Sequence, residues 1–160
     1  RYFSLSHSEA ISLQLPDRDL IRISPPGARH LRGFKFTNEA WESLVKEGAR
    51  CRLFYPREKL SNSATRYVAD GEEAGVDQAY KCAVRSPWWK IPLVAVPDLF
   101  LTYMNNDRPR LVANEAGVNI LNSIYGVTLR HGRKALGREL LPIACLNTVT
   151  LLGSEIVGRA

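Results

Sequence analysis

The sequence is poor in the residues from which self-contained active sites are usually built. Its 160 residues include three cysteines, three histidines and one methionine. Cys51, Cys82 and Cys145 are widely spaced, with no Cys-x-x-Cys pair and no nearby His, so neither a disulfide framework nor a zinc site is expected. We expect buried structural thiols and a reducing, cytoplasmic compartment.

Long apolar runs and catalytic fingerprints are also missing. The apolar stretches at 91–96 and 140–149 contain Pro or polar residues and fall far short of the roughly 18 to 20 residues of a membrane span. There is no glycine-rich phosphate or dinucleotide loop, and no His has a Ser or Cys partner at a known motif spacing. We therefore expect a chain without a membrane segment or a metal site, and without catalytic residues of its own.

What is present is a basic chain of globular composition. A hydrophobic content of 45% and a charged content of 24% predict one globular domain over residues 1–160 with its own core. The 22 Lys and Arg residues exceed the 16 Asp and Glu residues, and the resulting net charge of +6 favours an anionic partner. The first residues resemble neither a start site nor a signal peptide, which suggests a domain excised from a longer chain.

The charge is segregated along the sequence. Residues 61–80 carry one Arg and four acids, which leaves a local charge of −3 and predicts an acidic helix turned away from any polyanion. Residues 81–134 carry eight Lys and Arg residues against three acids, a local charge of +5. A polyanion is therefore expected to bind the second region.

The pattern of apolar residues predicts an α+β fold, a small mixed, mainly antiparallel sheet with helices packed on it. Residues 99–104 and 111–114 have strand character and flank a turn rich in Asn and Asp, so they are expected to pair as a hairpin, with 124–129 as a third extended segment. Thr37 is the predicted cap of a helix that ends at Gly48, and 138–149 has helical spacing with Pro142 tolerable only in the first turn. These two helices are expected to cover the sheet.

The most informative run is residues 80–93, where two adjacent Trp residues lie between cations. Planar rings beside guanidinium and ammonium groups suit stacking on bases and pairing with phosphates. Because side chains alternate in an extended segment, we expect one of Trp88 and Trp89 to point inward and the other outward. The alternative is a protein–protein interaction module in which this Trp pair is the docking patch.

A second run supplies amide and guanidinium groups on turns. Asn pairs bidentately with adenine and Arg with guanine in the major groove, whereas Ser and Lys suit phosphates. Asn in a Gly-rich turn can equally be there for its backbone conformation, and both readings stay open. The candidate DNA contacts from all segments are Arg29, Arg32, Lys81, Arg85, Trp88, Trp89, Lys90, Arg110, Asn114, Asn119, Asn122, Ser123, Arg130, His131, Arg133 and Lys134.

Four segments together carry a resemblance to a known family. They are Ala28-Arg29-His30-Leu31-Arg32-Gly33, the Arg85-x-Pro87-Trp88-Trp89 run, Pro97-Asp98 with the strand after it, and Arg110-Leu111-Val112-x-Asn114 continuing to Asn122-Ser123. In this order they resemble the C-terminal target recognition region of bacterial N6-adenine DNA methyltransferases of restriction-modification systems, over nearly the whole chain.

The resemblance implies a division of labour. In such enzymes a separate N-terminal Rossmann-like domain binds S-adenosylmethionine and carries an Asn-Pro-Pro-Tyr type motif, and neither lies in these 160 residues. Ser24-Pro25-Pro26-Gly27 lacks the amide and the aromatic ring of that motif and reads as a plain turn. The expected partners are double-stranded DNA and the catalytic domain of the same chain, which would methylate an adenine flipped out of the duplex.

Overall fold

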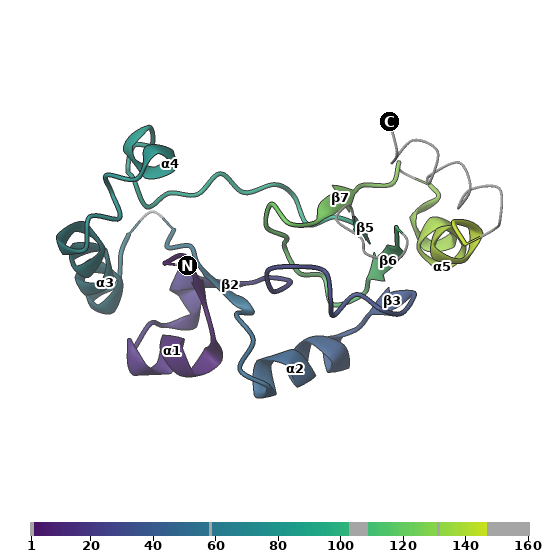
Figure 1. Ribbon diagram of the computed structural model, residues 1–160, viewed down its shortest axis with the longest axis horizontal. Helices are drawn as coiled ribbons and strands as arrows, with labels where there is room; N and C mark the ends of the chain where they lie inside the picture. The colour runs from purple at the N-terminus through teal and green to yellow at the C-terminus, as the bar shows by residue number, and fades with distance from the viewer. Residues whose placement is uncertain (1, 58, 103–108, 131, 147–160) are drawn as a thin grey trace. The chain divides into compact units, whose positions relative to one another are not determined.

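The structure is a computed structural model that describes residues 2–57, 59–102, 109–130 and 132–146 (Figure 1). Chain length predicts one domain, whereas the contacts divide the chain into two compact units, each built from two segments. Unit 1 comprises residues 1–25 and 43–94, and unit 2 comprises residues 26–42 and 95–160. Each unit contains its own β-sheet, so each is described by itself.

Unit 1 is a three-stranded antiparallel sheet with short helices. Its strand order is β1-β4-β2, with Ser4 paired to Leu53 and Leu20 paired to Phe54. Its elements are β1 (Ser4–Leu5), α1 (His7–Ser12), a 3-10 helix (Asp17–Asp19), β2 (Leu20–Arg22), β4 (Arg52–Phe54), α3 (Asn62–Glu73) and α4 (Tyr80–Ala83).

Serine caps begin the two longer helices of unit 1. The Ser6 hydroxyl accepts the amide of Glu9 at 3.2 Å, and the Glu9 carboxylate accepts the Ser6 amide at 2.7 Å, a reciprocal capping box for α1. Ser61 accepts the amide of Ala64 at 3.1 Å and so starts α3, the acidic helix predicted within 61–80. Buried Ser61 also donates to buried Asp19.

The core of unit 1 is aromatic and aliphatic. Phe54 is fully buried, and the Tyr67 ring meets it edge-on at 4.9 Å between ring centres. The core cluster consists of Leu5, Ala10, Leu15, Leu20, Phe54, Ala64, Tyr67 and Val68, with Tyr2, Phe3, Leu13, Leu60, Trp88 and Trp89 packed against it. Unit 1 therefore draws its core from both ends of its sequence.

Unit 2 is a four-stranded mixed sheet of order β3-β6-β5-β7, in which only the β3–β6 pair is parallel. Its strands are β3 (Lys35–Phe36), β5 (Leu99–Leu101), β6 (Leu111–Asn114) and β7 (Tyr125–Val127), and α5 (Lys134–Ala144) packs against β6. Helix α2 (Asn38–Lys46) begins in unit 2 and ends in unit 1. Phe36, Leu99, Phe100, Val112 and Val118 are buried in the core of unit 2.

The register defines two ends of the unit 2 sheet. At the first, Leu101 lies between Leu111 and Tyr125, and we call it the Ser123 end because Ser123 lies two residues before β7. At the second, Leu99 lies between Ala113 and Val127, and we call it the Asp98 end. β7 therefore begins at the Ser123 end, whereas both residues of β3 pair at the Asp98 end, Lys35 with Ala113 and Phe36 with Asn114.

These elements confirm the predicted α+β class and the predicted hairpin. β5 and β6 pair antiparallel as expected, although the tip at 103–108 lies outside the described residues. The Thr37 hydroxyl accepts the Ala40 amide at 3.3 Å and caps α2, and Gly48 follows that helix with a φ of +79°.

The C-terminal helix and the Trp run differ from expectation. α5 starts at Lys134 rather than at 138, so Pro142 lies near its end instead of in its first turn. Pro142 removes only one backbone hydrogen bond there, and its ring is buried. Residues 84–90 form turns rather than a strand, so alternation does not govern Trp88 and Trp89. No helix in the described parts of the chain is long and apolar enough to cross a membrane.

Candidate functional site

The predicted DNA contacts are divided between the two units. Unit 1 holds Lys81, Arg85, Trp88, Trp89 and Lys90; unit 2 holds Arg29, Arg32, Arg110, Asn114, Asn119, Asn122, Ser123, Arg130, Arg133 and Lys134. His131 lies outside the described residues. The predicted contacts therefore do not all lie on one unit.

Trp88 belongs to the packing of unit 1. Its ring centre lies 5.5 Å from that of Tyr2 and 6.2 Å from that of Phe3. A Cβ added at Gly71 of α3 would come within 2.8 Å of the Trp88 ring, so the helix approaches the indole as closely as glycine permits. Trp88 is thus closely packed against α3 at Gly71.

The indole N–H of Trp88 donates to the Glu72 carboxylate at 2.9 Å. The sequence predicts an acidic helix turned away from any polyanion, whereas this helix is bonded to Trp88, one of the predicted DNA contacts. α3 and the Trp run are neighbours because glycine at position 71 lets the indole close on the helix, a contact between residues 16 positions apart that spacing does not reveal.

Trp89 is half-buried like Trp88, and both pack against the core cluster of unit 1. The expectation of one inward and one outward ring is wrong, because the turn at 84–90 directs both rings toward the same core. Lys81 and Lys90 are exposed and Arg85 is half-buried. The cations of this run are therefore accessible to solvent, whereas its Trp rings pack mainly against the core of unit 1.

Asn114 is held inside unit 2. It is 2% exposed, and its side-chain amide donates to the carbonyls of Pro97 at 2.8 Å and Val118 at 3.0 Å. Its carbonyl oxygen accepts the Val118 amide at 3.2 Å. This side chain closes a turn, in agreement with the conformational reading of Asn in turns, so we remove Asn114 from the set of surface contacts.

A buried carboxylate organises the Asp98 end. Asp98 accepts the Leu129 amide at 2.8 Å and lies 2.6 Å from the Arg138 guanidinium and 3.3 Å from the Lys134 ammonium. Burial alone would raise the pKa of Asp98, but the Leu129 amide and the two cations outweigh it and hold the pKa below its usual range. Lys134 thereby anchors α5, whereas Arg130 and Arg133 are exposed.

The Ser123 end gathers another part of the predicted set. The Ser123 hydroxyl accepts the Gly27 amide at 3.0 Å, and the Arg110 amide donates to the Thr102 hydroxyl at 2.9 Å. Asn122 is exposed, while Asn119 is half-buried, and among the described residues the side-chain oxygen of Asn119 has no hydrogen-bond partner. Arg29 and Arg32 are exposed on the 26–33 loop that follows Gly27.

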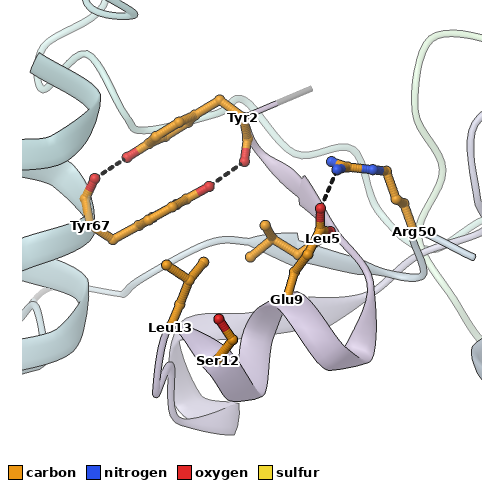
Figure 2. A pocket seen from close by; sticks show the side chains of 7 residues that line it. All are labelled: Tyr2, Leu5, Glu9, Ser12, Leu13, Arg50 and Tyr67. Carbon is orange, nitrogen blue, oxygen red and sulfur yellow. Dashed lines mark hydrogen bonds and ion pairs between the residues drawn. The ribbon is translucent and has the colours of Figure 1, made fainter. Parts of the chain in front are cut away.

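A hollow of about 350 Å³ opens on unit 1 and was not foreseen from the sequence. Figure 2 shows its lining, with the two Tyr rings on one side and the Glu9 and Arg50 side chains on the other. The lining residues are Tyr2, Leu5, Glu9, Ser12, Leu13, Arg50 and Tyr67. They come from segments far apart in the chain, which is why spacing gives no sign of the hollow.

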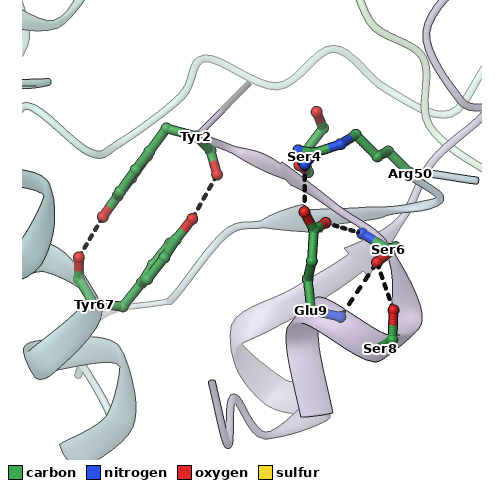
Figure 3. Close-up of polar contacts among 7 residues, drawn as sticks. All are labelled: Tyr2, Ser4, Ser6, Ser8, Glu9, Arg50 and Tyr67. Carbon is green, nitrogen blue, oxygen red and sulfur yellow. Dashed lines mark hydrogen bonds and ion pairs between the residues drawn. The ribbon is translucent and has the colours of Figure 1, made fainter. Parts of the chain in front are cut away.

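The polar groups of this hollow are engaged with one another. The Tyr2 and Tyr67 rings stack at 4.4 Å, and each hydroxyl donates to the other residue's backbone carbonyl, at 2.6 and 2.7 Å (Figure 3). Arg50 donates to the Ser4 carbonyl and to the Glu9 carboxylate. Burial raises the pKa of Tyr67 to about 12 and also raises that of Tyr2, so both hydroxyls stay protonated at neutral pH. The arrangement stabilises unit 1.

The cysteines are structural in the described part of the chain. Cys51 and Cys82 are buried and Cys145 is half-buried, and all three are free thiols. Burial raises the pKa of Cys51 to about 11 despite the nearby Arg52, which keeps the thiol protonated and unreactive. Among the described residues, no group of three or more His, Cys, Asp or Glu side chains could hold a metal ion.

One comparison with known proteins gives a match. The model of the family described as "Type II methyltransferase M.Eco57I, C-terminal domain" matches residues 1–160. No curated protein and no solved structure matches the chain.

Proposed function

Because the chain belongs to the family of C-terminal domains of type II methyltransferases typified by M.Eco57I, we propose that it is the DNA target recognition domain of a site-specific adenine-N6 methyltransferase. It holds duplex DNA while a separate catalytic domain methylates a flipped adenine. An enzyme that modifies a base inside a duplex must extrude it, and a second domain that grips the flanking DNA supports that step.

The observation that carries the proposal is the set of exposed guanidinium groups on unit 2. Arg29, Arg32, Arg130 and Arg133 are exposed, and none of them forms an ion pair with another described residue. Guanidinium groups pair bidentately with phosphate and with guanine edges, so exposed cations without an ion-pair partner among the described residues are suited to a polyanion. Lys134 and Arg138 differ because both already neutralise Asp98.

The test is binding of the 160-residue chain to a mixed-sequence DNA duplex over a range of salt concentrations. Affinity should fall by about 0.9 log unit per log unit of salt for each phosphate contacted. Arg133→Ala should weaken binding and reduce this slope by about 1, since one phosphate contact is lost. Arg66→Ala, which removes an exposed cation from acidic helix α3, is the matched control and should change neither. Binding that is absent or insensitive to salt contradicts the proposal.

S-adenosylmethionine is assigned to the catalytic domain rather than to these residues. Calorimetry of the chain with the cofactor should therefore show no saturable heat, and a clear isotherm would overturn the division of labour.

The docking-patch alternative has less support. Trp88 and Trp89 pack against the core of unit 1, and the Trp88 N–H is bonded to Glu72, so the pair does not form the exposed aromatic surface that such a module requires.

A further inference from the structure

A hydrogen bond joins two segments of unit 2 that lie 96 residues apart. The Gly27 amide donates to the Ser123 hydroxyl at 3.0 Å, which fixes the start of the 26–33 loop beside the 119–124 turn. Gly27 has a φ of +90°, a conformation that L side chains rarely adopt, so glycine at this position lets the chain turn toward Ser123. The loop and the turn therefore meet although the sequence separates them widely.

The 26–33 loop is anchored on the sheet beneath it. Leu31 is 1% exposed, and the His30 ring meets Phe36 edge-on at 5.4 Å between ring centres. Within the loop, the Leu31 amide donates to the Ala28 carbonyl at 3.0 Å, and Arg32 Nε donates to the Arg29 carbonyl at 3.0 Å. Leu31 thus faces inward, and the exposed Arg29 and Arg32 are presented from a fixed backbone.

The 26–33 loop begins at the Ser123 end of the sheet and leads into β3, whose residues pair at the other end. It is bonded to Ser123, just before edge strand β7, and it leads into the opposite edge strand β3. Tyr125, the first residue of β7, pairs with Leu101 at the Ser123 end. The loop therefore starts beside Ser123 and leads to the opposite edge strand, with Arg29 two residues after the bonded Gly27 and Asn122 directly before the bonded Ser123.

The Asp98 end offers a different chemistry. There Lys134 and Arg138 are paired with Asp98, and the Asn114 amide is consumed inside a turn. Arg130 and Arg133 follow β7 at this end with exposed guanidiniums, which suffice for phosphates. Recognition of base edges additionally needs hydrogen-bond donors and acceptors that are held in fixed directions. Arg29 and Arg32 of the anchored 26–33 loop can supply donors, and the side-chain amide of Asn122 can supply both.

We propose that the 26–33 loop and the 119–124 turn form one surface that sets the DNA sequence preference, with Arg29, Arg32 and Asn122 touching base edges. Ser123 is a positioning residue that acts through Gly27 and does not touch DNA. This inference rests on the proposed function, and it separates sequence reading at the Ser123 end from phosphate contact at the Asp98 end.

The test uses a duplex pool with a randomised centre. Selection with the 160-residue chain yields a preferred duplex, and affinity is then measured for that duplex and for a scrambled version of it. Arg29→Ala, Arg32→Ala or Asn122→Ala should lower the ratio of the two affinities by about 5- to 150-fold, the discrimination carried by one bidentate base contact. Arg133→Ala should weaken both complexes equally and leave the ratio unchanged.

The positioning role of Ser123 is tested by a separate measurement. Ser123→Ala should lower the affinity ratio while leaving the salt slope unchanged, because no phosphate contact is lost, and Ser123→Thr, which keeps the hydroxyl, should restore the ratio. Thermal melting confirms that each variant is folded. A Ser123→Ala variant that retains the full ratio would overturn its positioning role.

The outcomes separate the two proposals. If the unaltered chain prefers the selected duplex but the Arg29, Arg32 and Asn122 variants weaken both duplexes equally or neither, the surface does not read sequence and this inference is overturned while the proposed function stands. If the unaltered chain binds no duplex, or binds every duplex with the same affinity, the proposed function itself fails.

Discussion

Two segments of this molecule look alike in sequence and do opposite things in the structure. The Arg85-x-Pro87-Trp88-Trp89 run and the Arg29-His30-Leu31-Arg32 run both place ring side chains beside cations. In the first, the Trp rings pack on the unit 1 core and Trp88 is bonded to an acidic helix. In the second, the ring and Leu31 anchor the loop while both guanidiniums remain exposed. The neighbouring element, rather than the composition, decides which side chains meet solvent.

The comparison is tested most strongly by removing the indole. Trp88→Ala should lower the free energy of unfolding by about 3 kcal/mol, near the lower end for loss of a large aromatic side chain because the ring is only half-buried. Urea denaturation measures this change. Affinity for a mixed-sequence duplex, measured without denaturant, should stay within about twofold, a difference of about 0.4 kcal/mol. A loss of DNA affinity with little loss of stability would reverse the roles assigned to the two segments.

The Asp98 end provides the next largest effect. Asp98→Asn removes the charge that Lys134 and Arg138 share and should cost about 2 kcal/mol of stability, in the range for hydrogen bonds to charged groups. Urea denaturation gives the change. Lys134→Ala should also lower stability, whereas Arg133→Ala, which alters an exposed cation without a described ion-pair partner, should affect only DNA affinity. Equal loss of stability in the Lys134 and Arg133 variants would contradict the anchoring role of Lys134.

The 26–33 loop should respond to pH through His30. Burial lowers the pKa of His30 from 6.5 to about 4, so the unfolded chain binds a proton at this ring before the folded chain does. The stabilisation is complete above pH 6.5 and is lost as the pH falls toward 4, by about 2 kcal/mol once solvent screening of this half-buried ring is allowed for. His30→Phe keeps a ring against Phe36 and should remove this part of the pH dependence.

Unfolding free energies of the two proteins, measured between pH 7 and pH 4, isolate the effect because all other titrating groups are common to both. Parallel curves would show that His30 is not what anchors the loop.

The sequence predicts the local structure better than it predicts which residues lie on the surface. Caps such as Thr37 and the hairpin of β5 and β6 follow from residues close in the chain, and both are found. The family resemblance agrees with the family match over residues 1–160. The division into two units, the Trp88–Glu72 bond and the Gly27–Ser123 bond depend on contacts between residues 16 to 96 positions apart, which no periodicity encodes. Asn114 and Asn122 have the same chemistry, and only the fold shows that one is buried and the other exposed.

The smallest expected effect concerns the Trp88–Glu72 hydrogen bond, which distinguishes the Trp run from the Arg29-His30-Leu31-Arg32 run. Glu72→Gln keeps an oxygen that can accept the Trp88 N–H and should leave stability within about 0.5 kcal/mol of the unaltered chain, whereas Glu72→Ala removes the acceptor and should cost about 1 kcal/mol.

Both variants remove one negative charge beside the Trp run. If that run contacted phosphates, either change would raise DNA affinity and steepen its salt dependence, because a repulsive charge near the backbone is lost. We expect instead that neither variant changes affinity by more than about twofold, about 0.4 kcal/mol. Salt titrations of binding to a mixed-sequence duplex decide between the two results, and a shared gain in affinity for Glu72→Gln and Glu72→Ala would return residues 85–90 to the DNA-binding surface.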